Sequence, residues 1–390
     1  MPAVSLVIPV YNSEEFLPGC LESVVSQTMR DMEIICVDDG STDSSPSILA
    51  DFASRDPRMR IVRQENAGQG AAREHGLGLA TGTYVMFLDN DDDFEPTMVE
   101  EAYERCVADG ADITVFKIRY VDATTKDSFV PEWALRMDLL PAKRPFNRRD
   151  MPSTFFIAFT PALWNKMFRR SFLVDADVHF RPDLRLSDDL AFTYAALALA
   201  DKISVIDKAL VNYRTKREGS LWTKLSEHPM DIVFALREAK HRIVQGGVYA
   251  DVQPAFENAA LSQCLYNLST IRTHDAFRQL YDALKTESFE EFGLLGHDEG
   301  HWVRPEEYRK LVRIMDSTPE QYLMDEVRTG TQTVIRQRER IKKLTARLAK
   351  SEDRRRAIEQ SASYRLARGI AAIPRSMGRA LRATNGGKKR

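Results

Sequence analysis

The chain has 390 residues, more than one average domain, and its 43% of hydrophobic residues is ordinary for a globular protein. No apolar stretch approaches the roughly 20 residues of a transmembrane helix, and the four scattered cysteines lack the paired spacing of a disulfide framework. The net charge of −2 hides an asymmetry, because residues 331–390 carry 18 Lys and Arg against 4 Asp and Glu, which leaves −16 on the preceding residues.

The first ninety residues alternate short β-branched runs with amphipathic segments. Strands are expected within 5–12 and 33–38, where turn formers follow each run, and at 60–63 and 84–88. Helices are expected at 13–27, 44–53 and 70–79. This alternation predicts an α/β fold, a mostly parallel sheet with helices on both faces.

Polar residues follow these strands. The carboxyl ends of parallel strands meet at one edge, where open α/β sheets bind their ligands. Arg73 lies near the start of a predicted helix, where backbone N–H groups favour anions, and this position favours a contact with phosphate. The edge would collect Tyr11, Asp38, Asp39, Arg73, Asp89 and Asp91.

A burst of acids, Asp89-Asn90-Asp91-Asp92-Asp93, comes directly after the apolar run 84–88. Packed carboxylates repel one another, and Mg²⁺ is typically held by one or two carboxylates plus substrate phosphates. The alternative is a polar turn that closes the strand. Of the extra acids Asp92 and Asp93, at least one is expected to be merely solvated.

Four motifs in order resemble the inverting family 2 glycosyltransferases of the GT-A fold, over residues 3–125 and more loosely over 160–225. They are Val-Ile-Pro-Val-Tyr-Asn at 7–12, Val-Asp-Asp-Gly-Ser-Thr-Asp at 37–43, Asn-x-Gly-x-x-x-Ala-Arg at 66–73 and Phe-Leu-Asp-x-Asp-Asp at 87–92. The resemblance implies a nucleotide-sugar donor, usually a UDP-sugar, and Mn²⁺ or Mg²⁺. It assigns the metal to Asp91, and the ribose or the metal to Asp89.

The same motifs imply donor contacts, each with a structural alternative. Tyr11 would stack on the base or be an ordinary turn residue. Asp39 would bind a uracil edge or a ribose hydroxyl, or form an Asx turn, a role that Asp38 or Asp43 could fill instead. The donor contacts implied in this half of the domain are Pro9, Tyr11, Asp38, Asp39, Gly68, Arg73 and Asp89.

A second acidic motif, Asp188-Asp189-Leu190-Ala191-Phe192, resembles the acidic pair plus Phe of the family, in which the second acid is the catalytic base. That acid is Asp189 here, and Asp188 stands where the family usually has Glu, so either acid could act. General-base assistance is worth about 10²–10⁴ in rate. The alternative is a pair of acids at the start of a helix 188–200, capped by Ser187.

Two neighbouring segments also match the family. Trp164, in Trp-Asn-Lys-Met-Phe-Arg, would stack on an acceptor sugar or fill the core. Arg214 and Arg217 lie in a segment that resembles a loop closing over the donor, and they would meet the diphosphate or form a solvated basic loop.

The expected domains are a GT-A catalytic domain at 1–225, a helical accessory region at 226–329 and a basic helical tail at 330–390. The catalytic domain would divide into a nucleotide-binding half, 1–95, and an acceptor half, 96–225, with loops at 121–150.

The tail would hold a short coiled coil at 331–360, as Val334, Ile341, Leu344 and Leu348 suggest, and a basic amphipathic helix at 361–382. Such a helix is typical of anionic membrane surfaces, or it would fold back on the acidic core.

Other chemistries fit less well. Arg73 replaces the third glycine of a dinucleotide-binding fingerprint, and the tail has no nucleic-acid-binding motif. His297 and His301 have helical i, i+4 spacing, but Glu299 is misplaced for a zinc protease and nearby glycines argue against a helix.

The sequence therefore predicts a metal-dependent inverting glycosyltransferase that extends a surface polysaccharide or a lipid-linked glycan. We expect it in the cytoplasm, without a signal peptide, either free or peripheral on the inner face of a membrane, and either monomeric or homo-oligomeric. The alternatives are a nucleotide-dependent polyol-phosphate transferase on the same scaffold and a non-catalytic membrane-associated adaptor.

Overall fold

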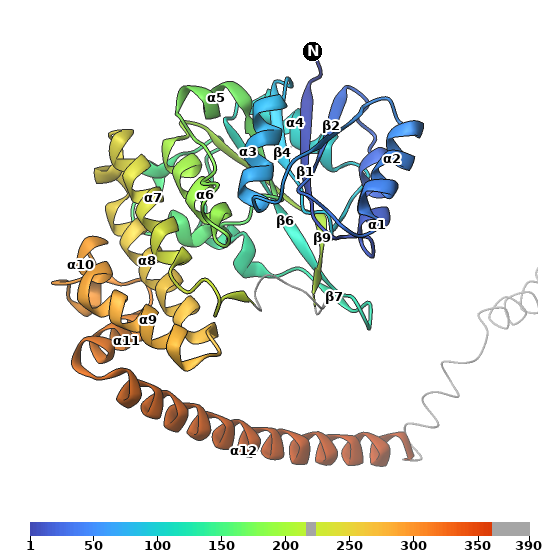
Figure 1. Cartoon of the computed structure of the whole chain (residues 1–390). Coiled ribbons are helices and arrows are strands. Elements are labelled where there is room, and N and C mark those ends of the chain that lie inside the picture. The colour runs from blue at the N-terminus through green and yellow to red at the C-terminus, as the bar shows by residue number, and fades with distance from the viewer. Residues whose placement is uncertain (216–223, 361–390) are drawn as a thin grey trace, which may run out of the picture. The chain divides into compact units, whose positions relative to one another are not determined.

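The computed structural model describes residues 1–215 and 224–360. The chain divides into two compact units, Met1–Pro319 and Glu320–Arg390. The first unit is built on one mixed sheet, with helices packed around it (Figure 1).

The N-terminal half of the sheet is parallel. Its strands β1 (Val4–Val10), β2 (Met32–Asp38), β3 (Met59–Arg63) and β4 (Tyr84–Phe87) lie in the order β3-β2-β1-β4. Every residue of β1 and β4 is buried, which explains why these strands are continuous apolar runs and do not alternate with polar residues. The predicted strands and their parallel pairing are confirmed.

Three helices join these strands, and a fourth follows them in the chain. They are α1 (Leu17–Val25), α2 (Ser45–Arg55), α3 (Gln69–Leu79) and α4 (Met98–Asp109). The first begins four residues later than expected, next to Pro18, which suits a first helical turn. Gly76 lets α3 lie close to the sheet, since a Cβ atom there would come within 2.3 Å of a Val7 methyl group.

The other half of the sheet is mixed, because one of its strands is antiparallel to both of its neighbours. The strands β8 (Lys166–Arg169) and β6 (Ile113–Asp122) run antiparallel, while β9 (Ile203–Thr215) is parallel to β6. Two short strands, β5 (Asp93–Phe94) and β7 (Ser128–Phe129), pair with β9 and β6. The fold class is confirmed as α/β, with a sheet that is parallel in one half and mixed in the other.

The segment 121–150 is mostly irregular, with 3₁₀ turns η1 (Glu132–Ala134), η2 (Met137–Leu139) and η3 (Arg148–Asp150), as expected. A further turn, η4 (Phe156–Ala158), precedes β8. The helices α5 (Arg170–Asp175) and α6 (Asp188–Leu199) complete this part of the chain.

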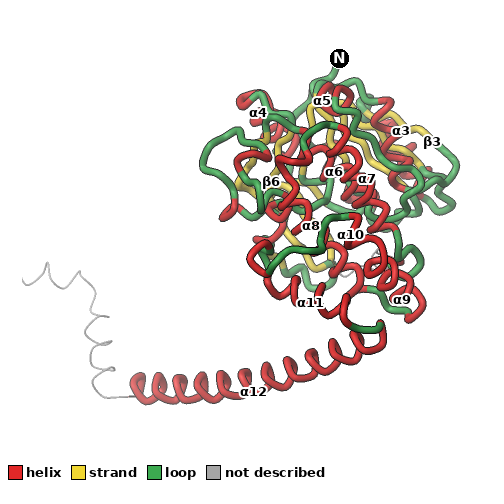
Figure 2. The backbone as a smooth tube through the Cα atoms, turned by 90° about the vertical axis from the view of Figure 1, so that its left-hand side faces the viewer, coloured by secondary structure: helices red, strands yellow, loops and turns green. Residues whose placement is uncertain are grey.

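Helices dominate after residue 229, again as expected. They are α7 (Asp231–Gln245), α8 (Tyr249–Thr270), α9 (His274–Ala283), the π-helix η6 (Leu284–Ser288), α10 (Phe289–Glu291), η7 (Glu299–His301) and α11 (Pro305–Asp316). Of these, α7 lies beside α6, and α8 lies beside α7 (Figure 2).

One long helix, α12 (Pro319–Gln360), begins before the tail and includes the segment predicted as a short coiled coil. Ile341 and Leu344 are exposed at 62% and 52%. The predicted amphipathic helix 361–382 lies outside the described residues. Across 1–215 and 224–360, no helix has the length and apolar character to cross a membrane.

Candidate active site

The turn that follows β2 is fixed by two buried aspartates. The carboxylate of Asp38 accepts a hydrogen bond from the Ser41 N–H at 2.9 Å. The carboxylate of Asp39 accepts from the Ala67 and Gly68 N–H groups at 2.8 and 2.9 Å. Asp39 therefore sets the backbone that leads into α3, where Gly68 adopts a φ of +95°. This structural role of Asp39 differs from the predicted Asx turn, since the local turn contact, to the Ser41 N–H, is made by Asp38.

The end of β1 presents an aromatic ring to solvent. Tyr11 is 49% exposed, and Asn12 after it has a left-handed φ of 45°. The carbonyl of Pro9 accepts a hydrogen bond from the Asn90 side chain at 2.7 Å. This bond holds the first strand end against the acidic loop.

The acidic loop after β4 forms a compact cluster. Asp89, Asp91 and Asp92 each offer a carboxylate oxygen, and these oxygens lie within 4.8 Å of one another. Asp92 is fully buried and accepts from the Arg214 N–H at 2.9 Å, while Asp93 pairs with the Arg214 guanidinium. The expectation that one of these two extra acids is merely solvated is wrong, because β9 lies beside the loop and supplies partners for both.

A buried arginine joins the two acidic motifs. The guanidinium of Arg73 donates to Asp89 at 2.6 Å and to Asp188 at 2.7 Å. Gln69, one turn earlier on α3, donates to the second oxygen of Asp188 at 2.8 Å. Gly70 permits this approach of α6 to α3, since a Cβ atom there would lie 3.3 Å from that of Asp188. Asp89 and Asp188, about a hundred residues apart in the chain, thus form ion pairs with the same arginine side chain.

The two acids of the second motif have different environments. Asp188 is fully buried in its ion pair with Arg73, whereas Asp189 lines a cavity. Burial, and next the neighbouring Asp188 charge, raise the pKa of Asp189 to about 7. Ser187 occupies the N-cap position with a left-handed φ of 61°, but it makes no side-chain capping bond within the described part of the chain. The predicted Ser187 cap is therefore wrong.

The cavity has a volume of about 780 Å³ and contains one acid from each motif, Asp89 and Asp189. Trp164 lines it and stacks on Tyr213, with ring centroids 5.3 Å apart. Helix α8 supplies another wall, with Ser262, Gln263, Tyr266 and Asn267, and Arg304 lies nearby. The two acidic motifs therefore face one shared space.

The other predicted site residues fall into three groups. Arg73 and Arg214 line the cavity. Arg217 lies outside the described residues. Of the residues that the structure describes, the following predicted site residues do not line the cavity: Pro9, Tyr11, Asp38, Asp39, Gly68, Asp91 and Asp188.

Sequence reasoning missed several residues of the cavity wall and one buried lysine that interacts electrostatically with Asp189. Lys166 is fully buried, and its ammonium donates to the Thr160 carbonyl and the Asn165 side chain at 2.8 Å each. Burial lowers the pKa of Lys166 to about 7. Tyr120, Tyr266 and Arg304 line the cavity without belonging to any local motif, so only the tertiary fold identifies them. The Lys166 position was visible within the Trp-Asn-Lys segment, but its burial was not.

Comparison with known proteins places the chain in a family. The model of glycosyl transferase family 2 matches residues 5–176. The glycosyltransferase GlyG of Streptococcus pneumoniae serotype 4 is 32% identical over 230 residues, which are 56% of this chain and 72% of GlyG. The chain belongs to glycosyl transferase family 2. The resemblance inferred from the sequence motifs is confirmed.

Other relatives fit the same picture. The uncharacterised glycosyltransferase EpsJ of Bacillus subtilis is 32% identical over 218 residues, which are 55% of this chain and 61% of EpsJ. The chain thus spans less than two thirds of EpsJ. The structure of S. aureus TarS 1–349 in complex with UDP-GlcNAc matches with a TM-score of 0.52 and 19% identity, over 81% of this chain and 91% of that one. That likeness supports the predicted GT-A fold.

Proposed function

We propose that this family 2 chain is a metal-dependent inverting glycosyltransferase that moves a sugar from a nucleotide sugar to a hydroxyl group of a glycan or lipid-linked acceptor. The observation that carries the proposal is the shared cavity, in which Asp89 and Asp189 face the same space and Arg73 connects their two motifs. A transferase needs this proximity, because the leaving group and the acceptor bind on opposite sides of one sugar.

The acidic cluster suits a hard divalent cation. Asp91 and Asp89 would hold Mn²⁺ or Mg²⁺, since both ions prefer oxygen ligands, and the buried Asp92 adds a third carboxylate. The chemistry supplied by such a cation is neutralisation of the negative charge that grows on the departing nucleoside diphosphate.

Asp189 is the proposed catalytic base. Its raised pKa keeps it basic enough to accept the proton of an acceptor hydroxyl near neutral pH, and its place on the cavity wall makes it accessible. Asp188 is buried in the ion pair with Arg73, so we assign it to positioning. We therefore propose that Asp189, and not Asp188, acts as the base.

The donor would be a UDP-sugar bound along the carboxyl edge of the parallel strands. The exposed ring of Tyr11 is available to stack on the base, and Arg214 at the cavity wall is available to the diphosphate. Pro9, Asp38, Asp39 and Gly68 would shape the backbone around the nucleoside, and Arg217 would add a second cation. Trp164 would contact the acceptor sugar.

The regional assignments follow from these roles. Residues 1–95 would bind the nucleotide, 96–225 would carry the base, and 226–329 would shape the acceptor side through α8. The basic tail at 330–390 would hold the enzyme at an anionic membrane on its inner face. The acceptor would then belong to a surface polysaccharide or a lipid-linked glycan.

A thermal-shift screen of nucleotide sugars with and without Mn²⁺ tests the proposal, because a bound ligand stabilises the native state. We expect a UDP-sugar to raise the melting temperature only with Mn²⁺, and Asp91→Asn to abolish the shift. Release of CMP instead of UDP from candidate donors would identify the rival polyol-phosphate transferase. No stabilisation by any nucleotide donor would favour the non-catalytic adaptor.

A further inference from the structure

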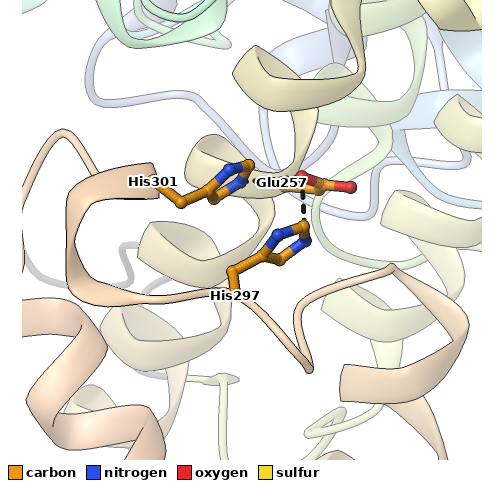
Figure 3. A group of neighbouring side chains, drawn as sticks. All are labelled: Glu257, His297 and His301. Carbon is orange, nitrogen blue, oxygen red and sulfur yellow. Dashed lines mark ion pairs between the residues drawn. The ribbon is translucent and has the colours of Figure 1, made fainter.

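A second cluster of possible metal ligands lies in the helical region. Glu257 of α8, His297 of the segment after α10 and His301 of η7 each offer one ligand atom, and these atoms lie within 4.8 Å of one another. Figure 3 shows both imidazole rings directed at the Glu257 carboxylate. In the part of the chain that the structure describes, none of the three residues lines the cavity that contains Asp89 and Asp189.

The spacing of the atoms suits a small tetrahedral ion. The Glu257 Oε2 atom lies 2.8 Å from His301 Nε2 and 3.5 Å from His297 Nε2. Ligands bound tetrahedrally at zinc distances of about 2.0–2.1 Å would lie roughly 3.3 Å apart. The two observed distances fall on either side of that value, so small side-chain shifts would complete the geometry.

A bound cation would stabilise the buried carboxylate of Glu257. Glu257 is 1% exposed, and its Oε1 atom accepts a hydrogen bond from Gln253 at 2.9 Å. Glu257 Oε2 and His301 Nε2 form an ion pair at 2.8 Å when the imidazole is protonated, but among the residues described neither atom makes a hydrogen bond. A buried polar group without a hydrogen bond is costly, and a shared cation would satisfy both atoms.

His297 can join them by a change of tautomer. Its Nε2 atom lies 3.0 Å from the Gly293 carbonyl oxygen, which favours a proton on that nitrogen. Coordination would move the proton to Nδ1, because a histidine ligand binds through a deprotonated nitrogen. The two rings are stacked with centroids 3.8 Å apart, so both Nε2 atoms approach the carboxylate together.

The surrounding backbone is shaped for this cluster. Gly293 has a φ of +81°, and a Cβ atom there would come within 3.0 Å of Glu257 Oε1. The indole of Trp302 packs edge-on against His301, with centroids 5.0 Å apart. The side chain of Asn258, next to Glu257, accepts a 2.7 Å hydrogen bond from the Val303 N–H and so holds the segment that follows His301.

We infer that Glu257, His297 and His301 bind a divalent first-row transition ion of the zinc class, with solvent completing the coordination. Imidazole nitrogen selects such ions, whereas the all-oxygen Asp89 cluster suits Mg²⁺ or Mn²⁺. The bound ion would be structural, because it would tie the 293–301 segment to α8. Arg304, three residues beyond His301, lines the catalytic cavity, so the ion would also steady that wall.

The full-length chain, stripped with a chelator, would be titrated with ZnCl₂ by calorimetry in excess Mg²⁺, which occupies the acidic cluster. We expect one tight equivalent and a higher melting temperature. His297→Ala and His301→Ala should each weaken Zn²⁺ binding by at least about tenfold, since even loss of an outer-shell partner typically costs that much. The control is His241→Ala, which removes an exposed histidine of α7 and should change nothing.

Glu257→Gln keeps the shape of the side chain, so it tests the site even if the alanine variants fold poorly, and it should also weaken binding. Replacing Zn²⁺ by Co²⁺ should give visible absorption bands that disappear in His301→Ala. The inference is overturned if the wild type binds no tight Zn²⁺, if the histidine and Glu257 variants bind it equally well, or if Asp91→Asn abolishes binding. None of these readouts depends on transfer activity.

Discussion

At the scale of single residues, one guanidinium organises the site. Arg73 bridges Asp89 and Asp188, which belong to motifs far apart in the chain, and it leaves the adjacent Asp189 to face the cavity. The two neighbouring acids therefore differ: Asp188 forms an ion pair with Arg73, whereas Asp189 has a raised pKa. Because the two environments differ, the assignment of Asp189 as the base and of Asp188 as a positioning residue can be tested.

The pH dependence of catalysis can be predicted from Asp189, the proposed base. Because burial raises its pKa to about 7, the carboxylate is protonated below that pH and cannot accept a proton. We expect kcat/KM for UDP release to rise with pH through about 7 and then level off. Donor affinity measured in the same buffers serves as the control. A rate that stays flat from about pH 5 to about pH 8 would contradict the assignment.

Stability should distinguish the two acids. Asp188→Asn breaks the buried pair with Arg73, and loss of one partner from such a pair typically costs about 3–5 kcal/mol of unfolding free energy. Asp189→Asn should cost little. Its folded pKa lies above the unfolded value, so ionisation of this carboxyl group destabilises the native protein as pH rises from about 4 to about 7.

Urea unfolding at a pH above 7 measures both variants. Asp189→Asn should be at least as stable as the wild type there, and Asp188→Asn should be clearly weaker. The reverse order would show that Asp189, and not Asp188, carries the structural contact.

At the scale of elements, helix α8 forms one wall of the cavity, which we propose to be the acceptor side. Tyr266 projects from α8, lines the cavity and is 47% exposed, so its ring is available to a sugar face. We expect Tyr266→Ala to raise the acceptor KM by roughly 2- to 10-fold, the range that aromatic contacts are worth, and to leave the donor affinity unchanged.

The matched control is Tyr266→Phe, which keeps the ring. Steady-state kinetics with varied acceptor at saturating donor checks this effect. A change in donor affinity without a change in acceptor KM would place α8 on the nucleotide side.

The elements that sequence could predict are those with local signals. The parallel strands β1 to β4 are apolar runs bounded by turn formers, and Asp89, Asp91, Arg73 and Asp189 stand in compact motifs. The antiparallel insertion of β8 has no such signal, because its four residues acquire a partner only through the tertiary fold. The burial of Asp92 and the convergence of Glu257 with two distant histidines depend on long-range packing for the same reason.

At the scale of the whole molecule, charge is divided along the chain. Residues 331–390 carry a balance of +14, whereas the preceding 330 residues carry −16. Each basic residue near an anionic leaflet contributes on the order of 1 kcal/mol, and salt screens this attraction. The proposed membrane contact therefore rests on the composition of the tail.

A chain truncated after Thr329 should lose sedimentation with phosphatidylserine vesicles and keep its UDP release, because the cavity residues all lie in the first unit. Neutral phosphatidylcholine vesicles are the control, and the full chain should bind them weakly. Equal binding of the full and the truncated chain to anionic vesicles would contradict the proposed membrane contact of the tail.

The most direct test of the central claim is UDP release by Asp189→Asn, with the UDP-sugar and Mn²⁺ that stabilise the wild type in the thermal-shift screen. The account predicts a rate lower by about 10²–10⁴, with an undiminished melting-temperature shift from the donor, because the base is lost and the donor site is kept. A variant that releases UDP at the wild-type rate would contradict it.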